Sequence, residues 1–420
     1  MTNRKMQVIW LFGFISGFTI MISSYTLNYW LSEINIDLTT IGIFALISIP
    51  YAINFLWAPI FDLCKLPCFK NTYYPRISWL ILIQMSLSIS VFLISFCRPH
   101  ENIVVLGLLG FIVSLFASAQ DTILGALRTE IVTKLQQGEV SGNYIFGYRL
   151  GMMISSSGAV YLSQFISWQH IYMMFGGIIL VFATLIAFLF TNNAGISQLS
   201  DNKYPTNTVN AHNSFFSVLL PGRNNTYWLL VILFLILYRL PDNFISIMIN
   251  PFLLHIGYNA SEIALAGKLF GASAAIIGGL LASKVMKNRD LYSSLLLFGI
   301  LHLLAHLLYI YQNIYGKNIY ILCLITGVEG VTGGMMMAAY IALIASLCEG
   351  KFRSTQYAFF SSMMGLSRSI FPAISGYIVN AYGWNIFYIF VIIMSIPALI
   401  LIPILEQTAN NHYKWFNKRD

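Results

Sequence analysis

Hydrophobic runs of bilayer-spanning length recur along the whole chain, and they constrain its fold more than any other feature. At ~1.5 Å per residue, a helix of about 20 residues crosses a hydrocarbon core of ~30 Å. Runs of suitable length cover residues 8–30, 40–61, 77–96, 103–124, 143–166, 171–190, 227–254, 262–283, 292–312, 319–346, 355–380 and 384–405. The sequence therefore predicts an all-α membrane protein with twelve transmembrane helices.

Lysine and arginine avoid every second connection between these runs. Of the 23 basic residues, 17 fall on the side of both termini, only Arg98 and Lys317 lie in the opposite loops, and four lie inside spans. Because basic loops stay in the cytoplasm, we expect both termini to be cytoplasmic. The same asymmetry accounts for the net charge of +8, so no nucleic-acid partner is expected. The first run has no small-residue cleavage site, which predicts an uncleaved first helix.

The longest polar stretch, residues 192–226, separates six runs from six. It is rich in Asn, Ser and Thr, a composition typical of a linker. We therefore expect an N-terminal six-helix half over residues 1–191, a cytoplasmic linker over 192–226, and a C-terminal six-helix half over 227–420.

Weak internal similarity connects the two halves. Trp168 begins the sixth run and Trp384 the twelfth, each in a Trp-x-x-x-Tyr pattern and 216 residues apart. Arg149 and Arg368, in the fifth and eleventh runs, are 219 residues apart. Interfacial aromatics are common in membrane proteins, but that does not explain the similar offset of the arginines. Two parallel six-helix repeats are the architecture of major facilitator transporters, whose substrate site lies near the midplane between repeats.

Charged residues inside the runs are the main functional candidates, because an unpaired charge in hydrocarbon costs at least ~2.5–3.5 kcal/mol. The cations are Arg149, Arg239, Lys268 and Arg368, and the carboxylates are Asp121, Asp242 and Glu329. One cation is in excess, which suits an anionic solute. The carboxylates could carry protons if they are desolvated. The alternative is that these charges only pair to hold helices together.

Matching depths along the runs suggest which charges pair. Asp121 and Arg149 lie at one level, about 10 Å and 9 Å from the cytoplasmic face by helical rise. Asp242 matches the depth of Lys268 and also shares a helix face with Arg239, three residues earlier. Glu329 of the tenth run and Arg368 of the eleventh lie nearer the middle of the membrane.

Two further groups contain residue types that bind metals, a pair of histidines and a pair of cysteines. His302 and His306 lie one helical turn apart, so a metal site or a proton relay is conceivable, although we favour two neutral histidines packed against a polar neighbour. Cys64 and Cys68 have no nearby third ligand, so no metal is expected there. Nothing resembles a Walker loop, a dinucleotide fingerprint or a catalytic triad, so we expect no cofactor and no enzymatic activity.

Several short motifs follow one another in a specific order and spacing. They are Asp37-Leu-Thr-Thr-Ile-Gly42, Asn54-Phe-Leu-Trp-Ala-Pro59 with Asp62, Ser118-Ala-Gln-Asp121, Gly147-Tyr-Arg-Leu-Gly-Met152, Tyr238-Arg-Leu-Pro-Asp242, Gly333-Gly334-Met335 and Gly383-Trp-Asn-Ile-Phe-Tyr388. Together they make the chain resemble the AmpG-type muropeptide permeases of the major facilitator superfamily. The resemblance covers nearly the whole chain. In the family's patterns an aspartate stands in place of Gly125 and a lysine in place of Arg239.

The resemblance implies proton-driven import of anhydro-muropeptides, which are anionic sugar–peptides, across a bacterial inner membrane. The hypotheses for individual residues are substrate binding by Tyr148, Arg149, Arg239 and Arg368, proton coupling by Asp121 with Glu329 as its rival, and structural or gating roles for Asp62, Asp242 and Lys268. Two alternatives stay open at this point. One is a carrier of another anion, such as an acyl-coenzyme A, and the other is a membrane sensor that no longer transports.

Overall fold

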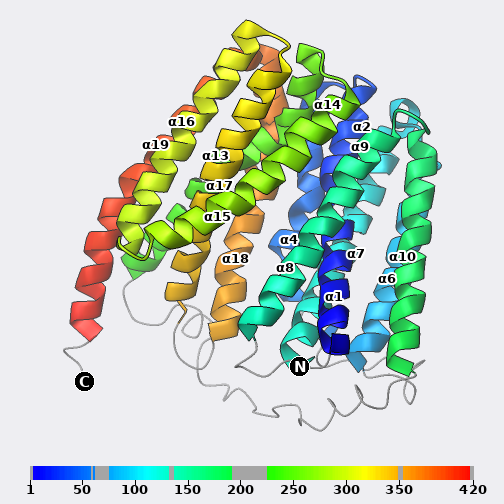
Figure 1. Cartoon of the computed structure of the whole chain (residues 1–420), viewed down its shortest axis with the longest axis horizontal. Coiled ribbons are helices and arrows are strands. Elements are labelled where there is room, and N and C mark those ends of the chain that lie inside the picture. The colour runs from blue at the N-terminus through cyan, green and yellow to red at the C-terminus, as the bar shows by residue number, and fades with distance from the viewer. Residues whose placement is uncertain are drawn as a thin grey trace. The chain divides into compact units, whose positions relative to one another are not determined.

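A computed structural model shows a chain that is helical along almost its whole described length (Figure 1). The structure describes residues 3–57, 60–61, 75–131, 137–191, 225–348 and 353–416. Within these ranges there is no strand, and nine helices are long and apolar enough to cross a membrane. They are Met6–Glu33, Arg76–Ile94, Pro99–Leu127, Trp168–Phe190, Thr226–Ile256, Ala260–Val285, Leu291–Tyr315, Ile319–Ser346 and Phe359–Ala409. Helices satisfy their own backbone hydrogen bonds, which is what hydrocarbon requires.

The chain divides into two compact units. Unit 1 consists of Met1–Ile34 and Leu46–Thr208, and unit 2 consists of Asn35–Ala45 and Val209–Asp420. The short segment Asn35–Ala45 therefore packs with unit 2, although unit 1 residues flank it in sequence.

Unit 1 is built from helices that are mostly long and continuous. Its elements are α1 (Asn3–Met21), η1 (Ile22–Thr26), α2 (Leu27–Glu33), α4 (Ile49–Ala52), η3 (Asn54–Leu56), α6 (Pro75–Ile94), α7 (Pro99–Ile131), α8 (Gln137–Met153), η6 (Ile154–Gly158), α9 (Ala159–Leu162) and α10 (Trp168–Thr191). The 3₁₀ helix η2 (Phe44–Ser48) contains the sequence boundary between the two units.

Helices α1 and α8 pack backbone to backbone because glycines line both. Each helix has two glycines four residues apart, Gly13 and Gly17 in α1 and Gly147 and Gly151 in α8. A Cβ atom on Gly17 would lie 1.9 Å from the carbonyl oxygen of Tyr148, where no real Cβ fits. Small residues at this spacing allow close approach of membrane helices. The contact therefore fixes the turn of α8 that carries Tyr148 and Arg149.

Both of these helices change to π-helical geometry further along, at η1 and η6. The hydroxyl of Thr26 in η1 donates to the carbonyl oxygen of Ser155 in η6 at 2.6 Å, and Ser155 is fully buried. A π turn widens the helix and disturbs its regular ladder of hydrogen bonds. A side-chain hydrogen bond across the two wide turns therefore joins the helices where the glycine contact ends.

Unit 2 carries the longer helices of the chain. Its elements are α3 (Leu38–Ile43), α13 (Asn225–Ile256), α14 (Ala260–Glu262), η8 (Ile263–Phe270), α15 (Gly271–Val285), α16 (Leu291–Tyr315), α17 (Ile319–Ser346), α18 (Arg353–Ser369), η10 (Phe371–Ile374) and α19 (Ser375–Phe416). Apolar side chains of α13, α16, α17, α18 and α19 form its core, which includes the buried Phe234, Phe298, Tyr340 and Phe360. This core lies beside the polar cluster described below.

The segment Asn35–Ala45 is anchored to unit 2 by a capped helix. The carboxylate of Asp37 accepts from the backbone N–H groups of Thr39 and Thr40 at 3.0 and 3.2 Å, and so caps α3. Asn380 of α19 donates to the same carboxylate at 2.7 Å. Burial raises the pKa of Asp37, but the hydrogen bonds from Asn380, Thr40 and Thr39 outweigh it, and the pKa lies below its ordinary value. A Cβ on Gly376 would lie 1.6 Å from the Leu38 carbonyl oxygen, so α3 lies directly on α19.

Several of the expected spans differ from simple continuous helices. The expected span 40–61 is divided among α3, η2, α4 and η3, and its apolar helix covers only Leu38–Ala52. Pro50, which lacks a backbone donor, lies in this broken region. The expected span 143–166 is interrupted by η6 and its helical part ends at Leu162. The runs 355–380 and 384–405 meet in α19, where Gly383 (φ +80°) makes the turn between them.

Candidate functional site

A cluster of charged and polar side chains lies within unit 2. Its first two members are on α13, where Arg239 and Asp242 lie three residues apart. At that spacing both side chains share one helix face, and Nη1 of Arg239 donates to Oδ2 of Asp242. Their side chains are only 18% and 16% exposed, so this ion pair is largely withdrawn from solvent. Pro241 between them supplies no backbone donor to α13. The predicted shared face of Arg239 and Asp242 is thus confirmed.

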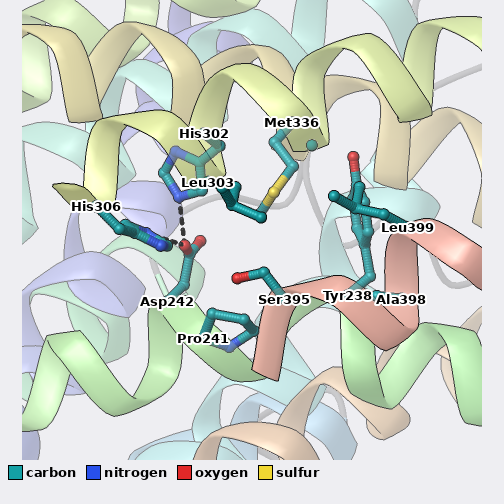
Figure 2. Close-up of a pocket in the computed structure, with 11 residues that line it drawn as sticks. Tyr238, Pro241, Asp242, His302, Leu303, His306, Met336, Ser395, Ala398 and Leu399 are labelled. Carbon is teal, nitrogen blue, oxygen red and sulfur yellow. Dashed lines mark hydrogen bonds and ion pairs between the residues drawn. The ribbon is translucent and has the colours of Figure 1, made fainter. Parts of the chain in front are cut away.

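Two histidines of α16 lie beside the free oxygen of this carboxylate. Oδ1 of Asp242 forms a hydrogen bond with Nε2 of His302 (Figure 2). Nδ1 of His302 lies 2.8 Å from the hydroxyl oxygen of Thr332 in α17. His302 and His306 have ring centroids 4.6 Å apart, as expected one turn apart on a helix. Three helices, α13, α16 and α17, therefore meet through polar side chains in the interior of unit 2.

His306 completes the cluster without a good hydrogen bond of its own. Its Nε2 atom is 3.6 Å from Oδ1 of Asp242, which is too long for a strong hydrogen bond. The side chain is 1% exposed, and neither ring nitrogen has a hydrogen-bond partner among the described residues. A cavity of about 10 Å³, near the smallest space that holds one water, adjoins both histidines and Asp242 (Figure 2). Ser395 of α19 also lines it.

Asp242, His302 and His306 each place one possible ligand atom within 4.8 Å of the others. Such a set can surround a small cation. However, the guanidinium of Arg239 already neutralises the carboxylate. A divalent ion would bring two uncompensated charges into a buried place, which is costly. The arrangement does not therefore favour a metal.

Glu329 lies one helical turn before Thr332 on α17. Its carboxylate accepts a hydrogen bond from the hydroxyl of Tyr309 on α16. The ring of Tyr309 stacks on Tyr388 of α19, with centroids 5.1 Å apart and an interplanar angle of 6°. Tyr309 and Tyr388 are both fully buried. This carboxylate is therefore held by Tyr309, whose ring is itself fixed by stacking on Tyr388.

In unit 1, the expected pairing of Asp121 with Arg149 is not formed. Asp121 of α7 receives a hydrogen bond from the Ser16 side chain of α1. Its Oδ1 atom is buried and has no hydrogen-bond partner within the described part of the chain. No ion pair joins Asp121 to Arg149 among the described residues. Matching depth along two helices does not fix their rotation, and here the two side chains do not meet.

The described residues give Arg149 and Arg368 no ion pair and no hydrogen bond from their side chains. Both arginines are half-buried, Arg149 on α8 and Arg368 near the end of α18. Tyr148, next to Arg149, stacks on Tyr144 with ring centroids 6.5 Å apart. Among the intramembrane cations whose side chains are described, these two arginines are thus available for a ligand.

The remaining candidates lie partly or wholly outside the described residues. Lys268 belongs to the π-helical segment η8, but its side chain is not among those described, so its expected level with Asp242 stays untested. Asp62, Cys64 and Cys68 lie outside the described ranges. Cys97, Cys323 and Cys348, which are described, form no disulfide with one another.

Sequence reasoning missed the contact between Asp242 and His302, and it missed Thr332 altogether. The signals were present separately, as two histidines one turn apart and an aspartate beside a proline. Their meeting depends on how α13, α16 and α17 pack, which no local pattern encodes. Gly333 is one residue that reflects this packing. A Cβ there would lie 3.2 Å from Cε1 of His302, so glycine leaves room for the imidazole ring.

Comparisons with known proteins agree with this architecture. The profile of the Major Facilitator Superfamily matches residues 9–328 and 291–417. The transporter AmpG 1 of Rickettsia bellii is 50% identical over 404 residues, which cover 95% of this chain and 98% of the relative. The anhydromuropeptide permease of Escherichia coli strain K12 is 30% identical over 408 residues, which cover 96% of this chain and 80% of that protein.

Solved structures show the same fold at low sequence identity. A bacterial homologue of the human lysosomal transporter Spinster aligns with a TM-score of 0.66 at 14% identity, over 96% of both chains. The nucleoside transporter NupG aligns with a TM-score of 0.68 at 11% identity, over 95% of this chain and 99% of its own. Together with the superfamily profile and the relatives from Rickettsia and Escherichia, these likenesses show that the chain belongs to the AmpG family of transporters in the major facilitator superfamily.

Proposed function

We propose that this transporter imports anionic sugar–peptides, most specifically anhydro-muropeptides, across a bacterial inner membrane by proton symport. The observation that carries the proposal is the presence of two half-buried intramembrane arginines, Arg149 and Arg368, without an ionic partner among the described residues. A buried guanidinium left without an anion is costly, so a ligand carboxylate is a natural partner. The name of the 30%-identical relative from Escherichia coli supports the same class of substrate.

The proposed substrate ligands are Tyr148, Arg149, Arg239 and Arg368. Arginine presents a planar fork of donors that matches a carboxylate in two places at once. Arg239 differs from the other two because Asp242 already accepts from its Nη1 atom. A substrate carboxylate at Arg239 would therefore compete with Asp242.

Proton coupling is proposed to use a carboxylate whose surroundings change between conformations, because such a change alters its affinity for a proton. Asp121 is the first candidate, since its Oδ1 atom is buried and without a hydrogen-bond partner in the described part of unit 1. Glu329 is the rival, held by Tyr309 in unit 2.

The central test is uptake of radiolabelled anhydro-muropeptide by energised membrane vesicles that contain the protein. We expect accumulation above the external concentration, abolished by a protonophore. Competition with unlabelled acyl-coenzyme A distinguishes the other anionic substrate class. The proposal would be contradicted if vesicles with normal protein abundance took up no muropeptide, or if a protonophore did not reduce the uptake.

Twelve crossings with both termini in the cytoplasm are part of the proposal. The support is the distribution of basic residues, 17 on one side against two on the other. Reporter fusions after Asp420 and within residues 192–226 should both give a cytoplasmic signal. A periplasmic signal from either fusion would require a different number of crossings before that point.

Replacing Arg149 or Arg368 with glutamine should weaken substrate binding. A hydrogen bond to a charged group contributes about 1.5–3 kcal/mol, so we expect the half-saturation concentration to rise by about tenfold to a hundredfold. Kinetics of uptake by Arg149→Gln and Arg368→Gln, normalised to membrane abundance, measure this. The control is Arg98→Gln, an exposed loop position whose arginine pairs with Glu101 at 3.3 Å. Unchanged half-saturation in both variants would remove these arginines from the binding site.

A further inference from the structure

We propose that His302 is a proton-binding site within unit 2, at which the bound proton is held as an imidazolium ion paired with Asp242. A role for this site in transport rests on the proposed function, because the site would supply a second proton carrier in addition to the carboxylate of Asp121. The binding of the proton itself does not depend on which substrate is carried.

His302 has partners suited to both of its charge states. Its Nε2 atom is hydrogen-bonded to the carboxylate of Asp242, so a proton on Nε2 is favoured in either state. Its Nδ1 atom lies 2.8 Å from the hydroxyl oxygen of Thr332. A hydroxyl can either donate or accept, which a carboxylate or an amide N–H cannot do.

The hydroxyl of Thr332 has a second partner, which allows it either to donate to Nδ1 of His302 or to accept from it. Its oxygen lies 2.8 Å from the backbone carbonyl oxygen of Val328, one turn earlier on α17. With neutral His302, the hydroxyl donates to the bare Nδ1 atom. With the imidazolium, Nδ1–H donates to the hydroxyl oxygen, and the hydroxyl turns to donate to Val328. One rotation of a hydrogen therefore accommodates the added proton without moving any heavy atom.

Charge balance in the cluster also favours one added proton. Arg239 and Asp242 cancel each other, and two neutral histidines leave the cluster without net charge. One proton adds a single charge directly beside the carboxylate, whereas a divalent metal would add two. A second proton on His306 is opposed, because the two rings are 4.6 Å apart.

The ionisable groups around His302 come from three helices. Arg239 and Asp242 face it from α13, and His306 lies one turn away on α16. Glu329 of α17 interacts electrostatically with His306. The residues of α19 that line the adjoining cavity are Ser395, Ala398 and Leu399, none of which is ionisable. Asp242 is thus the carboxylate in direct contact with His302.

The packing leaves a small space beside the two histidines and Asp242. The cavity of about 10 Å³ beside His302, His306 and Asp242 approaches the volume of one water. His306 borders it with two ring nitrogens that have no hydrogen-bond partner among the described residues. A water there could donate to or accept from either histidine and pass a proton between them.

The direct test is a nitrogen-15 NMR titration of full-length protein labelled at histidine and reconstituted in liposomes. The chain has seven histidines, and the loss of one resonance pair in His302→Gln assigns that residue. As the pH is lowered, we expect His302 to change from one protonated nitrogen to two, because the geometry offers a partner to each N–H. A His302 that keeps one bare nitrogen throughout, or that responds to added Zn²⁺ but not to pH, would overturn the proposal.

The transport test separates this site from the general proposal. In energised vesicles, His302→Gln should equilibrate the muropeptide without accumulating it, while counterflow exchange at equal pH on both sides continues. The matched control is His255→Gln, a histidine at the exposed end of α13, which should accumulate substrate like the wild type. Full accumulation by His302→Gln would overturn the role in coupling.

The titration and the transport test together distinguish failure of the proposed substrate from failure of proton binding at His302. If the wild type takes up no muropeptide, the proposed substrate fails, and the titration still decides whether His302 binds a proton. If His302→Gln is absent from the membrane, the titration of the wild type can be assigned instead from His306→Gln and variants of the other histidines. In that case a His302 signal that never gains a second proton still rejects the site.

Discussion

Replacing Gly17 with leucine should leave little folded transporter in the membrane. Even a Cβ atom at this position would lie 1.9 Å from the carbonyl oxygen of Tyr148, and backbone atoms of α8 cannot rotate away as a side chain can. The two helices would have to separate, and overpacking of this kind typically costs about 1–3 kcal/mol or more. We therefore expect lower abundance and a lower unfolding temperature in detergent, measured by fluorescence-detected size-exclusion chromatography before and after heating.

Gly177→Leu is the matched control for this prediction. Gly177 lies in α10, also in unit 1, and a Cβ there would meet nothing within 4 Å. Both variants add the same side chain to a glycine of a membrane helix, so a difference between them reports the helix contact alone. Equal abundance and equal thermal stability of the two variants would show that α1 and α8 are not in backbone contact.

Replacing Asp121 with asparagine should abolish accumulation of substrate while leaving exchange intact. Asparagine keeps the shape and the hydrogen-bonding capacity toward Ser16, but it cannot carry a proton. Because no ion pair with Arg149 is present among the described residues, the change does not leave a buried arginine unpaired there. We therefore expect normal membrane abundance, loss of proton-driven accumulation and preserved counterflow.

The comparison variants identify which carboxylate carries the coupling proton. Glu329→Gln removes the rival carboxylate, and Glu101→Gln removes an exposed loop carboxylate with a 61% exposed side chain as a control. Full accumulation by Asp121→Asn with failure of Glu329→Gln would transfer the role to Glu329. Loss of both accumulation and exchange by Asp121→Asn would indicate a binding role instead.

Hydropathy and the spacing of basic residues predicted much of the fold. Hydropathy identified the helical membrane spans, and the ordered motifs carried the resemblance to a transporter family; the structure and the relatives support both. Neither signal predicted that the run 40–61 is divided among short helices, because its residues are mostly apolar and the breaks depend on packing around Pro50. The count of twelve crossings and the orientation of the termini stay predictions.

For the candidate site, spacing within one helix was informative and depth between helices was not. Arg239 and Asp242 pair as their three-residue spacing predicted. Asp121 and Arg149 were matched only by their distance from the membrane face, and they form no ion pair among the described residues. A one-dimensional depth leaves the rotation of each helix undetermined, and a rotation of half a turn moves a side chain to the opposite side. The contact of His302 with Asp242 needed three packed helices.

The glycine contact between α1 and α8 has a consequence for how the protein is made. Gly17 leaves the ribosome about 130 residues before its partner Tyr148. At about 5–20 residues per second, α1 waits several seconds in the bilayer before α8 can reach it. During that interval lipid chains or a membrane chaperone must cover the helix face that carries Gly13 and Gly17. Newly made α1 is therefore open to incorrect helix partners until α8 is inserted.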